Sequence, residues 1–218
     1  GRVGSGQRTG IELPGEIGGL LHSPRTWSKI SITRIPMGHE VAVTPLQMVM
    51  AMATIANGGK MVAPRIVKSI VAEDGKTISP SGPTFVRQVI SAEAAAEVAL
   101  ALRGVVSKRG TAVEAAVPGY TLWGKTGTAQ KVDPKGGYEH GKAVVSFIGA
   151  LPADHPASVG LVVRDDPQAP ARDNYGGKVP APNSAPVACP PAQRARLEPR
   201  GGRGTQAARH PATHPRRT

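Results

Sequence analysis

Apolar side chains change their spacing along the chain, and the change predicts helices followed by strands. Residues 44–59, "TPLQMVMAMATIANGG", carry apolar side chains on almost every helical face, which predicts a helix buried on most sides. Thr44 and Pro45 supply a capping residue and a favoured first helical residue, and Gly58-Gly59 can end the helix in a left-handed turn. We interpret its methionines as core-packing residues rather than as a cofactor site.

A second helix is predicted over residues 91–106. Ser91 can cap its first turn, where Glu93 places a carboxylate near the positive end of the helix dipole. Gly110 follows its basic last turn. A further short helical piece is predicted over residues 111–116, before Pro118-Gly119.

Strand-forming residues dominate four other segments. The segment 65–78, "RIVKSIVAEDGKTI", predicts a strand, a turn at Asp74-Gly75 and a returning strand. Three more strands are predicted by "TLWGKTGTAQK", "AVVSFIGALPA" and "SVGLVVRDD", with the connections "DPKGGYEHG" and "DHPA" between them. Sequential strands with short turns form an antiparallel meander. Because helices precede this sheet, the predicted class is α+β, an antiparallel sheet flanked by helices.

Composition divides the chain into two parts. The 218 residues are enough for one domain with a true core, which we place at residues 1–182. The net charge of +12 would favour anionic partners, but residues 183–218 hold seven Arg and one Glu and so carry half of it. This tail is rich in Pro and poor in large apolar side chains, which predicts disorder.

Candidate metal ligands and membrane segments are sparse. The chain has one Cys, in the tail, and six His without convincing metal-ligand spacing, so we expect neither a metal site nor a cofactor. The longest apolar run is shorter than a spanning helix needs, and the first residues do not have the pattern of a signal peptide. We therefore expect any membrane anchor to lie outside this chain.

Residues 119–128, "GYTLWGKTGT", fit two unrelated signatures. The first is the phosphate-binding loop G-x-x-x-x-G-K-[ST], which needs a strand before its first glycine and a helix that begins at the Lys-Thr pair. The residues before Gly119 are typical of a helix end, strand formers fill the four intervening positions, and Gly127 interrupts any following helix. We therefore treat nucleotide binding as the weaker alternative.

The second signature is the K-T-G of serine acyl-transfer enzymes. It requires Lys125, Thr126, Gly127 and Thr128 to lie on an edge strand beside a cleft. Gly127 would let a substrate backbone approach, the two threonine hydroxyls would bind a carboxylate, and Lys125 would supply positive charge.

Other segments decide between the signatures. In order, "GQRTGIELPGE", "VTPLQMVMAMATIANGG", "WGKTGTAQKVDPKGGY", "SFIGALPA" and "NYGG" closely resemble the class B penicillin-binding proteins, most nearly the cell-division type. These are D,D-transpeptidases that cross-link peptidoglycan. The resemblance covers about residues 1–182 and implies a partial transpeptidase domain of the penicillin-binding and serine β-lactamase-like fold.

The resemblance also implies a reaction and a set of partners. In the family a serine in S-x-x-K attacks the D-Ala-D-Ala end of a stem peptide, and an amine on a neighbouring stem peptide resolves the acyl-enzyme. Lys125 would orient the catalytic groups, Thr126 and Thr128 would bind the substrate carboxylate, and the backbone N–H of Thr128 would form half of the oxyanion hole. β-Lactams would be inhibitors and divisome proteins would be partners. The location implied is the outer face of the cytoplasmic membrane.

The sequence departs from the family pattern in one decisive respect. It contains neither S-x-x-K nor S-x-N, and in the family both motifs precede the "GQRTG" segment. We therefore expect the C-terminal part of a transpeptidase domain, inactive alone. A different class of function remains open, because the Arg-rich tail could bind nucleic acid or another anionic polymer by charge. We expect no nucleic-acid binding, since that tail lacks aromatic residues for base stacking.

Overall fold

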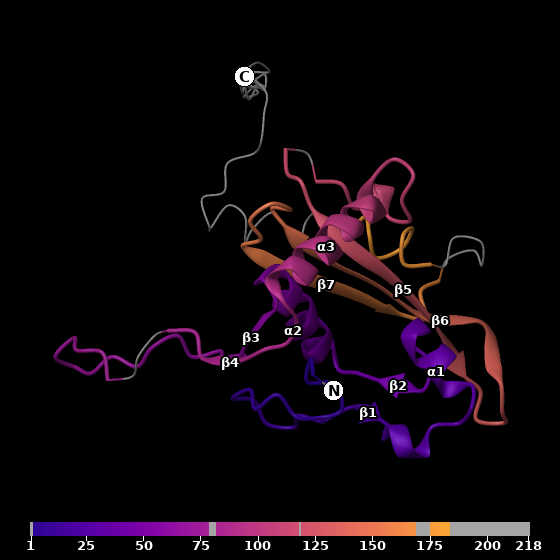
Figure 1. Cartoon of the computed structure of the whole chain (residues 1–218), viewed down its shortest axis with the longest axis horizontal. Helices are drawn as coiled ribbons and strands as arrows, with labels where there is room; N and C mark the ends of the chain where they lie inside the picture. The colour runs from indigo at the N-terminus through magenta and orange to yellow at the C-terminus, as the bar shows by residue number, and fades with distance from the viewer. Residues whose placement is uncertain (1, 79–81, 118, 169–174, 184–218) are drawn as a thin grey trace, which may run out of the picture.

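The computed structural model describes residues 2–78, 82–117, 119–168 and 175–183 (Figure 1). Its helices and 3-10 turns alternate with short strands before a long meander. In chain order the elements are β1 (Leu20–Leu21), η1 (Pro24–Thr26), α1 (Ser31–Arg34), η2 (Ile35–Met37), β2 (Val41–Ala42), α2 (Pro45–Ala56), β3 (Lys60–Val62), β4 (Phe85–Gln88), α3 (Ala92–Arg103), η3 (Gly104–Val106), η4 (Val113–Ala115), β5 (Trp123–Val132), β6 (Tyr138–Leu151) and β7 (Ser158–Asp165).

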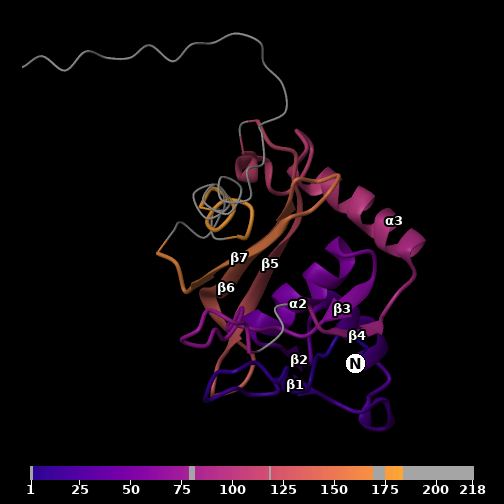
Figure 2. The ribbon, with the colours of Figure 1, turned by 90° about the vertical axis from the view of Figure 1, so that its left-hand side faces the viewer.

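The predicted antiparallel meander is confirmed. The three long strands pair in the order β5-β6-β7, with Gly127 opposite Ser146 and Ser146 opposite Val163. Helices α2 and α3 lie on one side of this sheet (Figure 2). There Trp123, Ala150 and Ala153 form a buried cluster with apolar side chains of both helices. The α+β class follows from this arrangement.

The opposite face of the sheet is covered by irregular segments. Phe147 is 2% exposed there. It packs with three buried alanines, which are Ala112 just before η4, Ala115 in η4 and Ala181 after β7. Two small clusters therefore hold β6 from both sides. Pro180 and Ala181 are fully buried, so the chain remains packed almost to the end of its described part.

Helix α2 begins as the sequence predicts. The Thr44 hydroxyl accepts the backbone N–H of Gln47, and the Gln47 side chain accepts the backbone N–H of Thr44 at 2.9 Å, which completes a capping box. The helix is less buried than predicted. Gln47, Met50 and Thr54 are buried, whereas most of its other apolar side chains are only half-buried.

Helix α3 is capped by Ser91, whose hydroxyl accepts the Ala94 N–H at 3.2 Å. It ends at Arg103 rather than extending to residue 106, because the next three residues tighten into the 3-10 turn η3. The helical piece predicted over residues 111–116 is a single 3-10 turn, η4.

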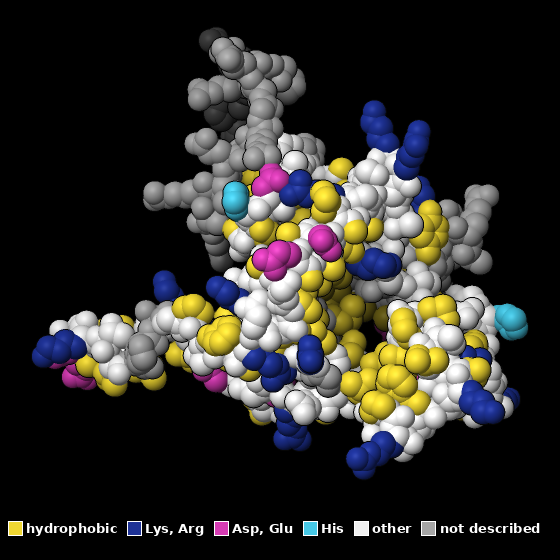
Figure 3. Space-filling model, viewed as in Figure 1, with side chains coloured by type: hydrophobic (Ala, Val, Ile, Leu, Met, Phe, Trp, Pro, Cys, Tyr) yellow, Lys and Arg dark blue, Asp and Glu magenta, His cyan; other side chains and the backbone are white. Residues whose placement is uncertain are grey.

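The strand pair predicted over residues 65–78 is the clearest error. Only one isolated bridge forms there, between Val71 and Thr77, although the predicted turn is present with Gly75 at φ 82°. The neighbouring strands β3 and β4 pair instead, and the segment between them protrudes from the body as an arm with hydrophobic side chains on its surface (Figures 1 and 3). We call the described residues of this segment, 63–78 and 82–84, the arm. No second layer buries its apolar side chains, so its strand propensity is not realised.

The connection between β5 and β6 is shorter than predicted. The sequence suggested a loop over residues 133–141, but β6 already begins at Tyr138. The turn closes with a hydrogen bond from Gly136 N–H to the Asp133 carbonyl at 2.9 Å, and Gly136 and Gly137 both have positive φ. Two adjacent glycines allow a tight turn that longer side chains would strain.

The predicted tail, residues 183–218, lies outside the described residues except for Asn183. Within the part of the chain that the structure does describe, no helix has the length and apolar character needed to cross a membrane.

Candidate functional site

The K-T-G residues lie inside strand β5, which is an edge strand of the three-stranded sheet. The exposed Lys125 side chain folds back along its own strand, and its Nζ donates to the Thr126 carbonyl at 2.7 Å. A phosphate-binding loop would require a helix to begin at Lys125 and Thr126. Because both residues are paired in a strand instead, the nucleotide alternative is wrong.

The pleat of β5 divides the four residues between its two faces. Successive side chains of a strand point to opposite sides, so Lys125 and Gly127 share the face of Trp123, which the helices cover. Thr126 and Thr128 share the other face, with Phe147 opposite Thr126 on β6. A single ligand can reach both sets only by lying along the free edge of β5, where the two faces meet.

Gly127 is required by the strand that pairs with it. A Cβ built at this position would lie 2.5 Å from the Ser146 Oγ. Such a contact forces either the serine or the strand to move. The absence of a side chain therefore keeps β5 and β6 in register beside Lys125.

Both threonine hydroxyls are held by residues that the sequence did not single out. Thr126 Oγ1 lies 3.2 Å from Thr111 Oγ1, and Thr128 Oγ1 accepts the Gly176 N–H at 3.2 Å. These bonds join the segment between η3 and η4, and the segment after β7, to the K-T-G strand. The "NYGG" segment signalled the family, but nothing in its pattern placed Gly176 against β5.

Gly176 lies unusually close to the sheet. An added Cβ would meet the Ser146 carbonyl oxygen at 2.5 Å and the Gly127 carbonyl oxygen at 2.8 Å. Both neighbours are backbone atoms of paired strands and cannot give way cheaply. The residue therefore has to be glycine for the segment after β7 to reach the Thr128 hydroxyl.

The "GQRTGIELPGE" segment forms a separate structural unit beside the start of α2. The Glu16 carboxylate accepts the Thr9 hydroxyl, the Thr9 N–H and the Gly10 N–H, and these bonds lower the pKa of Glu16 from its ordinary 4.5. The buried Gln47 amide donates to the Gln7 and Gly18 carbonyls, both at 2.7 Å. This segment, one of those that carry the family resemblance, is thus a loop held in place by hydrogen bonds and not a group of reactive side chains.

Taken together, residues 125–128 offer one cation and two hydroxyls on the edge strand β5. These groups suit an extended peptide with a terminal carboxylate. The described ranges contain no group of three or more His, Cys, Asp or Glu side chains arranged to hold a metal ion. The assigned roles of Lys125, Thr126, Gly127 and Thr128 stay predictions. The anionic-polymer alternative rests on the tail and falls outside the described residues.

Comparison with known proteins identifies relatives over most of the chain. Residues 1–188 match the family described as "Penicillin binding protein transpeptidase domain". Penicillin-binding protein PbpB of Mycolicibacterium smegmatis is 40% identical over 188 residues, which are 83% of this chain and 29% of that protein. Peptidoglycan D,D-transpeptidase FtsI of Escherichia coli is 35% identical over 181 residues, covering 83% of this chain and 28% of FtsI. The chain thus spans less than a third of these relatives.

The fold agrees with that of a solved structure. Penicillin-binding protein 3 from Mycobacterium tuberculosis, crystallised in complex with ampicillin, superposes with a TM-score of 0.81 at 35% identity. The match covers 94% of this chain and 46% of that chain.

Proposed function

Because the chain belongs to the penicillin-binding protein transpeptidase domain family, we propose that it forms the substrate-binding strand of a peptidoglycan D,D-transpeptidase of the cell-division type. The observation that carries the proposal is the position of Lys125-Thr126-Gly127-Thr128 on the free edge of β5. Relatives named as D,D-transpeptidases match the chain across this strand. The proposed substrate is a stem peptide that ends in D-Ala-D-Ala.

Each residue of the strand has a distinct role in this proposal. An extended peptide adds along β5, and the Thr126 and Thr128 hydroxyls bind its terminal carboxylate. Lys125 contributes positive charge near the scissile amide. The backbone N–H of Thr128 donates to the oxyanion that forms when a serine attacks the penultimate carbonyl and D-Ala leaves.

The hydroxyl contacts support a preorganised site. Thr126 is already held near Thr111, and Thr128 near Gly176. Their rotamers are therefore restricted before substrate arrives, which reduces the entropy lost on binding. Thr111 and Gly176 act in this scheme as positioning residues.

The proposal does not extend to activity of this chain by itself. A transpeptidase of this type needs the serine of S-x-x-K, and neither that motif nor S-x-N occurs in the sequence. We expect no acyl-enzyme when the chain is incubated with a labelled penicillin and analysed by intact-protein mass spectrometry. A stoichiometric covalent adduct would contradict this expectation.

The partners follow from the family in the same way. β-Lactams are proposed inhibitors of the complete enzyme, since they mimic the acyl-D-Ala-D-Ala group, and divisome proteins are proposed partners. The proposed site of action is the extracytoplasmic face of the cytoplasmic membrane, with the anchor outside this chain.

Substrate binding can be tested without catalysis. Titration of the ¹⁵N-labelled chain with a peptide ending in D-Ala-D-Ala should shift the amide resonances of residues 125–128. Lys125→Met should weaken binding roughly tenfold by removing a charge-assisted contact. Lys131→Met is the matched control, because Lys131 lies on the same strand but pairs with Asp165 at 2.8 Å. Equal losses in the two variants, or shifts elsewhere only, would refute the proposed site.

A further inference from the structure

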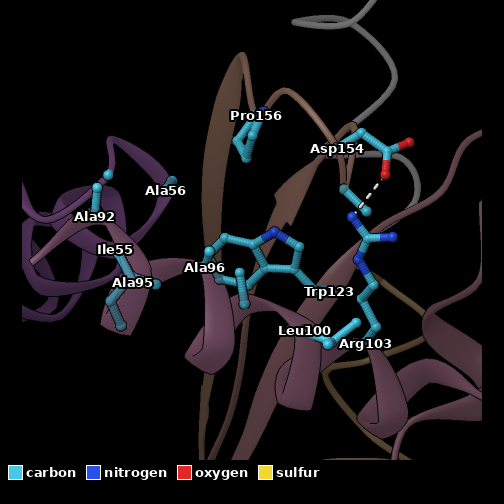
Figure 4. A pocket seen from close by; sticks show the side chains of 13 residues that line it. Ile55, Ala56, Ala92, Ala95, Ala96, Leu100, Arg103, Trp123, Asp154 and Pro156 are labelled. Atoms are coloured by element: carbon cyan, nitrogen blue, oxygen red, sulfur yellow. Dashed lines mark hydrogen bonds and ion pairs between the residues drawn. The ribbon is translucent and has the colours of Figure 1, made fainter.

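A cavity lies on the helix-covered side of the sheet, at the start of β5. It has a volume of about 360 Å³, within the range of small-molecule sites. The end of α2, helix α3 and the loop after β6 surround it (Figure 4). None of the residues 125–128 lines it, so it is separate from the K-T-G residues themselves. Its lining includes Ile55, Ala96, Leu100, Arg103, Trp123 and Pro156.

Two hydrogen-bond donors on the walls of this cavity lack partners. Trp123 is fully buried, and its Nε1 has no acceptor among the described residues. The Nε of Arg103 is likewise buried and unpaired within the described ranges. Buried polar groups are nearly always hydrogen-bonded, because an unpaired one loses its hydration without compensation. Both donors therefore favour a ligand that brings an acceptor oxygen.

The charge around the cavity limits which acceptor fits. Arg103 Nη2 pairs with Asp154 Oδ1 at 2.6 Å at one side of the cavity. Figure 4 shows this ion pair beside the Trp123 ring, whose nitrogen lies on the edge turned toward Pro156. Because Asp154 already neutralises the guanidinium and would repel a second carboxylate, a neutral acceptor is favoured over an anion.

The shape of the lining specifies the rest of the ligand. Ala92, Ala95, Ala96 and Ala99 of α3 leave a shallow apolar surface over the flat indole ring. Leu100, which also lines the cavity, is 68% exposed. A small aliphatic group attached to a planar amide matches this combination.

From these observations we infer that the cavity is a binding site for a neutral acylamide, whose carbonyl oxygen accepts the Trp123 indole N–H. Trp123 and Lys125 are two residues apart on the same face of β5. Ligand bound at the indole would thus contact the strand that carries the K-T-G residues, without occupying their edge. The inference rests on the cavity and its unpaired donors, and does not depend on the proposed transpeptidase function.

The indole proton of Trp123 provides a direct measurement. The chain has two tryptophans, and the other, Trp27, already donates its Nε1–H to the His22 carbonyl at 3.1 Å. Titration of the ¹⁵N-labelled chain with N-acetyl-L-alanine methylamide should move the Trp123 indole proton downfield in a saturable manner. The Trp27 indole resonance, assigned with Trp27→Phe, should stay in place. Propylammonium, which has no acceptor, should not produce the shift.

A pair of variants tests whether the cavity is responsible. Ala96→Leu fills the cavity and should weaken binding by about tenfold or more, since an overpacked site excludes the ligand. Ala101→Leu makes the same change at an exposed position of α3 that does not line the cavity, and should leave binding unchanged.

Three results would overturn the inference. One is a Trp123 indole proton that does not respond, or that lies at a hydrogen-bonded shift before ligand is added. Another is equal binding in the Ala96→Leu and Ala101→Leu variants. The third is an equal response to propylammonium.

Discussion

Strand β6 and the arm differ in structure although the sequence predicted strands in both. Val145, Phe147 and Ala150 in β6 are at most 2% exposed. In the arm, Val71 and Ile78 are 57% and 67% exposed, and one isolated bridge is all that forms between residues 65 and 78. Both segments are rich in β-branched residues, so composition does not explain the difference.

The difference is that β6 is paired along both edges and packed on both faces, whereas the described residues of the arm form only one isolated β-bridge. Strands β5 and β7 pair with both edges of β6, while helices pack on one of its faces and the 3-10 segments on the other. Strand propensity mainly reports how well a side chain packs on a half-buried surface. The K-T-G strand therefore pairs with a strand that is buried on both faces, which suits a site that has to keep its geometry.

The largest expected effect comes from truncating Phe147 in β6, compared with Phe85 of β4, the residue next to the arm. Phe147→Ala should lower the free energy of unfolding by about 3–5 kcal/mol, because it leaves a cavity in the sheet core. Phe85→Ala, at the base of the arm and 59% exposed, should change it by no more than about 0.5 kcal/mol. Urea denaturation followed by circular dichroism measures both. Similar losses would mean that the arm is buried in solution.

A smaller effect is expected from adding one methyl group to a glycine that contacts β6 and to a glycine in the arm. Gly127→Ala should cost about 1–3 kcal/mol by overpacking against Ser146, and Ser146→Ala in the same chain should recover most of the loss. Gly75→Ala, in the arm, meets no atom within 4 Å but has φ +82°. It should cost about 1 kcal/mol through backbone strain, with no recovery from Ser146→Ala. Additive effects of Gly127→Ala and Ser146→Ala in urea denaturation would contradict the contact.

The smallest effect concerns the attachment of the arm. The Glu12 carboxylate accepts the Ile66 and Val67 N–H groups, and these bonds, chiefly that of Ile66, lower the pKa of Glu12 from its ordinary 4.5. A carboxyl with a lowered pKa stabilises the fold fully above its unfolded pKa, and the stabilisation is lost as the pH falls through the folded pKa. The arm should therefore loosen in acid while β6 does not.

Amide proton shifts can follow this transition. Those of Ile66 and Val67 should titrate together with a midpoint below 4.5, whereas the Phe147 amide should not move. Glu12→Gln should abolish the transition. A midpoint at or above 4.5, or an unchanged titration in Glu12→Gln, would show that this carboxylate does not hold the arm.

The sequence predicted the elements whose signals are local. The Thr44 cap, the Ser91 cap and the three strands of the meander are all present, since capping groups and β-formers act over a few residues. Its errors fall where burial decides. The arm lacks a layer to pack on, and α3 and the piece at 111–116 shorten into 3-10 turns.

The same distinction between local signals and tertiary contacts applies to the candidate site. By itself the sequence determined the family and the four residues of the K-T-G strand, because a motif and its chemistry are properties of neighbouring residues. Only the tertiary structure decided which face of β5 the helices cover, and that Thr111 and Gly176 hold the two threonine hydroxyls. It also decided that the Trp123 Nε1 is buried without an acceptor among the residues that the structure describes. Such contacts join residues far apart in the chain, and their energies depend on packing that no local pattern records.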